Sequence, residues 1–156
     1  AKECLTLAKH LKLTDTVIFT GAVKLDDYLG RLDALALTSL SEAQPLVVLE
    51  AGAAGVPSVT TDVGCCRELL FGMAGENPAL GAGGAVTPGA DPEATANALA
   101  GILANPARRR AMGQAMQARV RQTYNKPDIM AIYGELYRRL AAAPGLPPLR
   151  MTAEAA

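Results

Sequence analysis

Three consecutive segments near the middle of the chain restrict its fold more than any others. Residues 34–38 (ALALT) are almost wholly apolar, residues 45–55 (PLVVLEAGAAG) lie between a proline and a glycine, and residues 56–61 (VPSVTT) are rich in β-branched side chains. Continuous apolar strands are typical of parallel sheets that helices cover on both faces, and proline and glycine favour the start and the end of a helix. The order strand, helix, strand therefore predicts a βαβ unit with a right-handed crossover.

The rest of the chain extends this pattern. Further strands are expected at 17–20 and 85–86, which makes about four strands in all. Helices are expected at 1–13, 25–32, 91–105, 106–124 and 127–143, with a strand-to-helix turn at 62–70 and a glycine-rich loop at 71–84. The pattern predicts an α/β fold, a Rossmann-like doubly wound parallel sheet with helices on both faces, followed by C-terminal helices. It predicts one domain at 1–143 and a disordered tail at 144–156.

Composition excludes several classes of function. Lysine plus arginine equals aspartate plus glutamate, 15 of each, which argues against nucleic acid as the main partner. No apolar run approaches the ~18 residues of a membrane span, and three cysteines make a poor disulfide framework, so a cytoplasmic location is expected. The one histidine, His10, is expected on the surface and far from the polar clusters, so the sequence indicates neither a catalytic triad nor a histidine metal site.

Two glutamates flank the start of the helix expected at 45–55. Glu50 is the only charged residue in that helix, which is apolar on every side and is therefore expected to be buried. A buried carboxylate is costly unless a ligand or side chain pairs with it. Glu42 lies in the turn before the helix, and the free N–H groups after Pro45 can hold phosphate oxygens. A ligand with a sugar, a diphosphate and a ribose in line would match this arrangement.

A second polar turn is expected beside the first. In a parallel sheet the turns at 39–44 and 62–66 both follow the carboxyl ends of strands, where ligands bind. Arg67 and Glu68 are either a solvated ion pair at a helix start or part of the site, and the sequence does not choose between them. Cys65 and Cys66 are expected to be small buried side chains.

The residues around both glutamates resemble those of a known family. Glu42 and Glu50, with seven residues between them, form the E-x7-E pattern of the retaining glycosyltransferases of family 4, and residues 50–57 resemble that family's EAMAAGxP. The combined strings 38–50 and 61–69 are similar to the PelF-type exopolysaccharide glycosyltransferases. The resemblance covers roughly residues 1–140 and implies the GT-B fold, of which this chain would be the C-terminal domain that binds the sugar nucleotide.

The resemblance also implies a role for each matching residue. Glu42 would contact the transferred sugar near the reaction centre, and Glu50 would bind the ribose hydroxyls. The segment that would contact the sugar and the diphosphate consists of Gln44, Pro45, Leu46 and Val47. Residues Gly21 to Val23 would lie near the base. Ala43 replaces the family's usual glycine, and Gly52 replaces its usual methionine, which is expected to loosen the packing of the helix.

The implied reaction transfers a hexose from a UDP-sugar, UDP-glucose in the PelF-type enzymes, to a growing polysaccharide with retention of configuration. No cofactor is implied, and the chain contains no Asp-x-Asp, which agrees with a metal-independent reaction. The acceptor-binding domain, the basic pair for the diphosphate and the first strands would precede this chain, which alone would be inactive. A synthesis complex at the inner membrane is a possible partner. Two alternatives stay open: a non-catalytic nucleotide-binding or interaction module, and a GT-B epimerase of UDP-sugars.

Overall fold

The computed structural model describes residues 2–142. The chain forms two compact units, of which the first ends at Arg31 and the second begins at Leu32. The first unit holds two helices, α1 (Lys2–His10) and α2 (Asp26–Leu29). Both are shorter than the sequence predicts; α1 ends two residues before Lys12, whose φ of 55° is incompatible with a continuing α-helix.

The strand expected at 17–20 is not formed. Ile18 is 84% exposed, and Val17 and Phe19 are exposed as well. Within residues 2–142, no strand pairs with this segment. The β-branched sequence favours an extended backbone, but a strand is stable only when a neighbour satisfies its N–H and C=O groups. The prediction of this strand was therefore wrong for the part of the chain that the structure describes.

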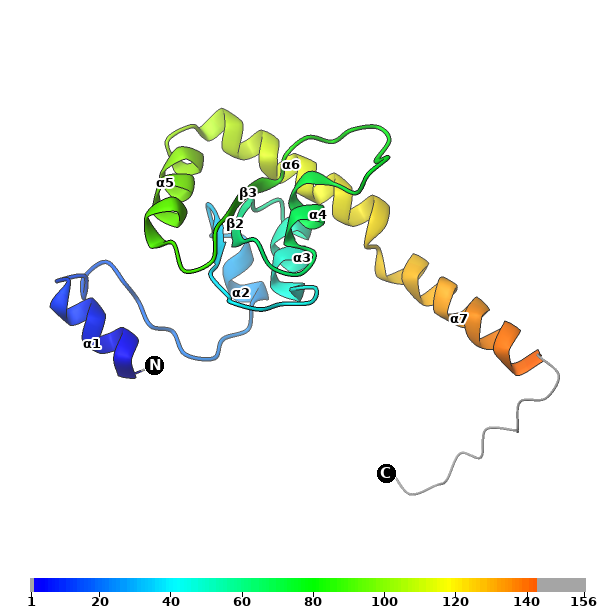
Figure 1. Cartoon of the computed structure of the whole chain (residues 1–156), viewed down its shortest axis with the longest axis horizontal. Helices are drawn as coiled ribbons and strands as arrows, with labels where there is room; N and C mark the ends of the chain where they lie inside the picture. The colour runs from blue at the N-terminus through cyan, green and yellow to red at the C-terminus, as the bar shows by residue number, and fades with distance from the viewer. Residues whose placement is uncertain (1, 143–156) are drawn as a thin grey trace, which may run out of the picture. The chain divides into compact units, whose positions relative to one another are not determined.

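The second unit is built on a parallel sheet of three strands, in the order β1-β2-β3. The strands are β1 (Leu35–Leu37), β2 (Ser58–Thr61) and β3 (Gly84–Thr87), and the helices are α3 (Leu46–Ala53), α4 (Cys66–Phe71), α5 (Pro92–Leu103), α6 (Pro106–Thr123) and α7 (Lys126–Ala142). Figure 1 shows β2 and β3 between α5 on one side and α3 and α4 on the other. All three strands lie where the sequence predicts them. The α/β fold with a parallel sheet is confirmed, although the described sheet has three strands and not about four.

Helices cover both faces of this sheet. Successive side chains of each strand point to opposite faces, so each strand contributes to the packing on both. Register places Leu37, Thr60 and Val86 opposite one another on the face under α3 and α4. Val59 faces the other way and packs against Ile102 of α5. Helix α6 contributes Met116 to the first core and Met112 to the second. The two small cores thus hold β2, the central strand, between them.

Helix α3 crosses α6 at close range, and glycines make this contact possible. A Cβ atom on Gly52 would lie 2.8 Å from the Met116 Cε atom, and a Cβ on Gly113 would lie 2.0 Å from the Gly55 carbonyl oxygen. Gly55 also ends α3 as the sequence predicts, with φ 76° and hydrogen bonds from Gly55 to Gly52 and from Val56 to Ala51. Gly52 therefore permits tight packing, and the expectation that it loosens the helix was wrong.

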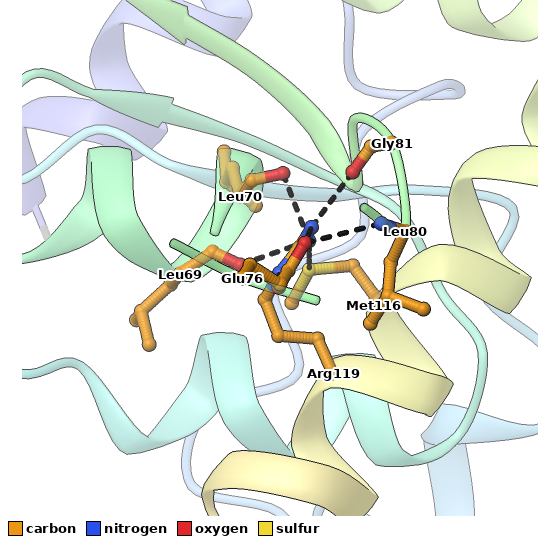
Figure 2. A network of polar contacts seen from close by, with 7 residues as sticks. All are labelled: Leu69, Leu70, Glu76, Leu80, Gly81, Met116 and Arg119. Carbon is orange, nitrogen blue, oxygen red and sulfur yellow. Dashed lines mark hydrogen bonds and ion pairs between the residues drawn. The ribbon is translucent and has the colours of Figure 1, made fainter. Parts of the chain in front are cut away.

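A buried arginine that the sequence analysis did not single out holds the loop between α4 and β3. The side chain of Arg119 is 1% exposed and that of Glu76 is 15% exposed. The Arg119 Nε and Nη2 atoms lie 2.6 and 2.9 Å from the two carboxylate oxygens of Glu76 (Figure 2). The guanidinium also donates to the carbonyl oxygens of Leu70 at 3.1 Å and Gly81 at 2.8 Å. This network ties the irregular segment 72–83 to α4 and α6.

Helix α7 differs from the other long helices because it has no buried residue. Its sequence carries an apolar stripe, and the structure leaves two members of that stripe, Ile132 and Tyr137, each 65% exposed. The tail predicted at 144–156 lies outside the described residues. Across residues 2–142, every helix is too short or too polar to span a membrane.

Candidate functional site

The two polar turns meet at the carboxyl edge of the sheet, as the sequence predicts. The Thr61 hydroxyl, at the end of β2, donates to the Ser39 carbonyl oxygen at 2.5 Å. The backbone N–H of Cys65 donates to the carbonyl oxygen of Ala43 at 3.0 Å. The turn that follows β1 is therefore bonded directly to the turn that follows β2, and Glu42 lies between the two bonded positions.

Gly64 makes the closest approach between these turns. Its φ is 50°, and a Cβ atom at this position would lie 2.3 Å from the carbonyl oxygens of both Glu42 and Ala43. Glycine adopts this backbone conformation and leaves room for the carbonyl groups. Ala43 needs no such freedom: within residues 2–142, the non-glycine residues with a left-handed φ are Lys12 and Ala90. The alanine that replaces the family's glycine is thus accommodated here.

Glu50 is exposed, and the expectation of a buried carboxylate was wrong. Val48 and Ala51 are fully buried against the sheet and α6, whereas Leu46 is 67% exposed on the opposite side of α3. Glu50 follows Leu46 by one helical turn and shares its open side. An apolar sequence cannot indicate which side of a helix is left uncovered, and here only one side of α3 meets the core.

The start of α3 carries unbonded N–H groups beside the two glutamates. Pro45 is the N-cap residue rather than the first helical residue, and it supplies no side-chain acceptor. Val48 is the first residue whose N–H bonds back, to the Pro45 carbonyl at 3.1 Å. In the part of the chain that the structure describes, the N–H groups of Leu46 and Val47 have no protein acceptor. This end of α3 suits an anion, since the helix dipole adds partial positive charge.

The remaining predicted donor-site residues fall into two groups. Gln44 is exposed, Pro45 is buried and Val47 is half-buried, all at the start of α3 with Leu46. Gly21 and Val23 belong to the first unit, where both are exposed. The structure therefore brings Glu42, the segment 44–47 and Glu50 to one helix start, and the placement of Gly21 and Val23 near a base stays a prediction.

The charged residues of the second turn pair with one another in the structure. Arg67 bonds to the carboxylate of Asp62, with its Nε atom 3.3 Å from Oδ1, and both side chains are largely exposed. The hydrogen bond from Arg67 lowers the pKa of Asp62. Arg67 is thus in a solvated ion pair, but its partner is Asp62 rather than the neighbouring Glu68.

The two cysteines differ in environment. Cys66 is fully buried, as the sequence predicts, whereas Cys65 is half-buried. Burial raises the pKa of the Cys66 thiol.

Sequence reasoning missed a hollow at the same edge of the sheet, on the side covered by α5. Its volume is about 460 Å³, and its lining includes Thr38, Thr61, Asp91 and Thr95. Asp91 accepts from the Ala94 N–H at 2.9 Å, so its carboxylate already caps α5. Neither glutamate lines this hollow. The residues that line this hollow come from segments far apart in the sequence, so no local sequence pattern predicts it.

Comparisons with known proteins agree with this fold. Residues 1–119 match the family described as glycosyl transferases group 1. The chain is 35% identical over 137 residues to D-inositol 3-phosphate glycosyltransferase of Kineococcus radiotolerans, a match that covers 85% of this chain and 31% of the relative. The chain therefore spans about a third of that relative's length.

Solved structures give the same result. Sucrose-phosphate synthase from Thermosynechococcus elongatus superposes with a TM-score of 0.80 at 30% identity, over 90% of this chain and 34% of the other. HepE of Anabaena in complex with UDP superposes with a TM-score of 0.73 at 21% identity, over 91% of this chain and 36% of the other, which supports the fold alone. Because the family match covers more than half of the sequence and the parallel sheet agrees with it, this chain belongs to the group 1 glycosyltransferases.

Proposed function

We propose that this chain is the donor-binding part of a retaining glycosyltransferase of family 4. One observation carries the proposal: Glu42 and Glu50 lie on either side of a helix start whose N–H groups have no protein acceptor, at the carboxyl edge of a parallel sheet. That edge is where ligands bind in open α/β sheets. The nucleotide sugar would lie across it, with its diphosphate over the start of α3.

In this proposal each donor-site residue contacts a different part of the nucleotide sugar. The N–H groups of Leu46 and Val47 bind the diphosphate and stabilise the charge that develops as it departs. Glu50 accepts hydrogen bonds from the ribose hydroxyls, and its exposure on the open side of α3 leaves it accessible to a ligand. Glu42 contacts the transferred hexose, with Gln44 and Pro45 beside it. Gly21 and Val23 approach the base.

The substrates follow from the resemblance to the PelF-type enzymes. We propose UDP-glucose as the donor and a growing exopolysaccharide as the acceptor, with no metal and no other cofactor. HepE, which shares the fold, was solved with UDP and with UDP and glucose. This chain spans about a third of the length of its relatives, and we propose that the acceptor site and the basic pair for the diphosphate belong to the other parts of the complete enzyme. We place the whole enzyme in the cytoplasm, with a partner complex at the inner membrane.

Titration calorimetry with UDP and UDP-glucose tests the proposal in the complete protein that contains this chain. Glu50→Gln should weaken both ligands by about 10-fold or more, because a charge-assisted hydrogen-bond pair contributes roughly 1.5–3 kcal/mol. Glu42→Gln should lower the kcat of transfer strongly and leave UDP binding intact. Glu93→Gln is the matched control, since Glu93 is an exposed glutamate in the first turn of α5 and should change neither ligand.

A non-catalytic module is the second candidate, and the exposure of Glu50 favours it, because an exposed carboxylate needs no ligand to offset burial. Absence of UDP binding at millimolar concentration in the complete protein would favour this candidate and contradict the transferase proposal. Conversion of UDP-glucose into an epimer without any acceptor would instead identify an epimerase.

A further inference from the structure

We propose that Gly64 is a positioning residue for Glu42. The turn after β2 packs against the turn that carries this carboxylate and fixes its conformation. The inference rests on the function proposed above, in which Glu42 contacts the transferred sugar. It adds that the geometry of Glu42 is set by a residue of another turn, which itself need not touch the substrate.

The turn at 39–44 has little structure of its own. Within the described residues, no backbone hydrogen bond joins any two members of this segment. It is held instead by two hydrogen bonds from outside the segment: the Thr61 hydroxyl, at the end of β2, donates to the Ser39 carbonyl, and the Cys65 N–H, in the turn after β2, donates to the Ala43 carbonyl. A segment without internal hydrogen bonds takes its conformation from what it packs against, and here that surface is residues 61–65.

Gly64 is the point of closest packing on that surface. The carbonyl oxygens of Glu42 and Ala43 both occupy the space where a side chain at position 64 would begin. An added methyl group would lie 2.3 Å from each oxygen, whereas carbon and oxygen normally stay about 3.3 Å apart or more. Alanine at this position therefore requires the two turns to separate by about 1 Å, the difference between these two distances, which displaces the peptide that follows Glu42 relative to residues 61–65.

A displacement of this size matters for chemistry rather than for binding alone. A shift of about 1 Å in a reacting group can reduce the rate about 100-fold. UDP would be held by Glu50 and the start of α3, whereas the nearest atoms to an added Cβ at Gly64 belong to Glu42 and Ala43, so the affinity for UDP should change much less than the turnover rate. The expected signature is a large fall in kcat with a nearly unchanged dissociation constant for UDP.

The test measures kcat, KM for UDP-glucose and UDP affinity for Gly64→Ala in the complete transferase. Gly75→Ala is the matched control, since Gly75 has φ 88° and no neighbour within 4 Å of an added Cβ. It also places an alanine at a positive φ, but without a collision, and should retain full kcat. In the Glu42→Gln background, Gly64→Ala should cause no further loss, because a positioning residue acts only through the group that it positions.

Thr61→Val keeps the proposal falsifiable if Gly64→Ala does not fold. It removes the hydroxyl that bonds to Ser39 and preserves the shape of the side chain, so kcat should fall while the protein stays folded. Thr87→Val is its control, because the Thr87 hydroxyl bonds to the Thr60 carbonyl of β2 and to the Thr95 hydroxyl of α5, and not to the turn at 39–44.

The outcomes separate the two proposals. Wild-type kcat in Gly64→Ala or Thr61→Val, or losses that add to that of Glu42→Gln, would overturn the positioning role while the transferase function stands. Full activity of Glu42→Gln alone would overturn the role proposed for Glu42, and the positioning inference with it.

Discussion

Replacement of Glu76 by glutamine tests whether the buried ion pair holds the second unit together. The Arg119 side chain is almost wholly buried, and Glu76 supplies both of the oxygens that neutralise it (Figure 2). Glutamine keeps the shape of Glu76, but it places an amide group, which is a donor, against a guanidinium that has only donors. The guanidinium stays charged and loses its counter-charge, while its bonds to the Leu70 and Gly81 carbonyls remain.

The expected loss of stability is large. Breaking a fully buried ion pair by removing one partner costs about 3–5 kcal/mol. The Glu76 side chain is 15% exposed and lines a cavity of about 320 Å³, so water can replace part of the lost interaction. We therefore expect Glu76→Gln to lower the free energy of unfolding by about 2–4 kcal/mol, which is about 6–12 °C in Tm at roughly 3 °C per kcal/mol.

The same pair makes stability depend on pH. The hydrogen bond from Arg119 lowers the pKa of Glu76 below its ordinary value of 4.5. A carboxyl group whose pKa is lower in the folded state stabilises the protein fully above its unfolded pKa. This stabilisation is lost as the pH falls from about 4.5 through the lowered pKa of the folded state. Glu76→Gln should remove this part of the acid dependence.

Urea denaturation followed by far-ultraviolet circular dichroism measures both effects, since the chain has no tryptophan to report by fluorescence. Glu135→Gln is the matched control, because Glu135 forms ion pairs with Arg138 and Arg139 on α7. The side chains of these three residues are 41–77% exposed, in contrast to the buried Arg119. An exposed pair contributes about 0–1 kcal/mol, so this control should change little. Equal stability of Glu76→Gln and the wild type would refute the reasoning.

Two further predictions concern packing. Gly113→Ala should destabilise the chain by about 2 kcal/mol or more, because the new Cβ would collide with the Gly55 carbonyl and force α3 and α6 apart. Thermal unfolding measures this loss of stability, and an unchanged Tm would contradict the close crossing of the two helices. Cys66 should react with a thiol reagent at pH 8 far more slowly than the exposed Cys4, because the Cys66 thiol is buried and its pKa is raised. Mass spectrometry of the labelled peptides measures the two rates, and equal rates would mean that Cys66 is accessible.

Local sequence patterns were sufficient for the strands of the sheet and for the helices that follow it. The apolar run at 34–38 and the β-branched run at 56–61 formed strands because each has a parallel neighbour that satisfies its backbone. The same kind of pattern at 17–20 formed none, since within residues 2–142 it has no such neighbour. Gly55 ended α3 as expected, because the left-handed conformation that it supplies is a local requirement.

The sequence by itself determined that this chain builds a parallel α/β sheet and that two glutamates flank one helix start, because strand and helix periodicity and residue spacing are local properties. Only the tertiary structure decided that Glu50 is exposed, that Arg119 and Glu76 close on each other inside the second unit, and that Gly64 packs against the backbone of Glu42. Each of these features depends on contacts between residues that are far apart in the sequence, and no local sequence pattern predicts such contacts.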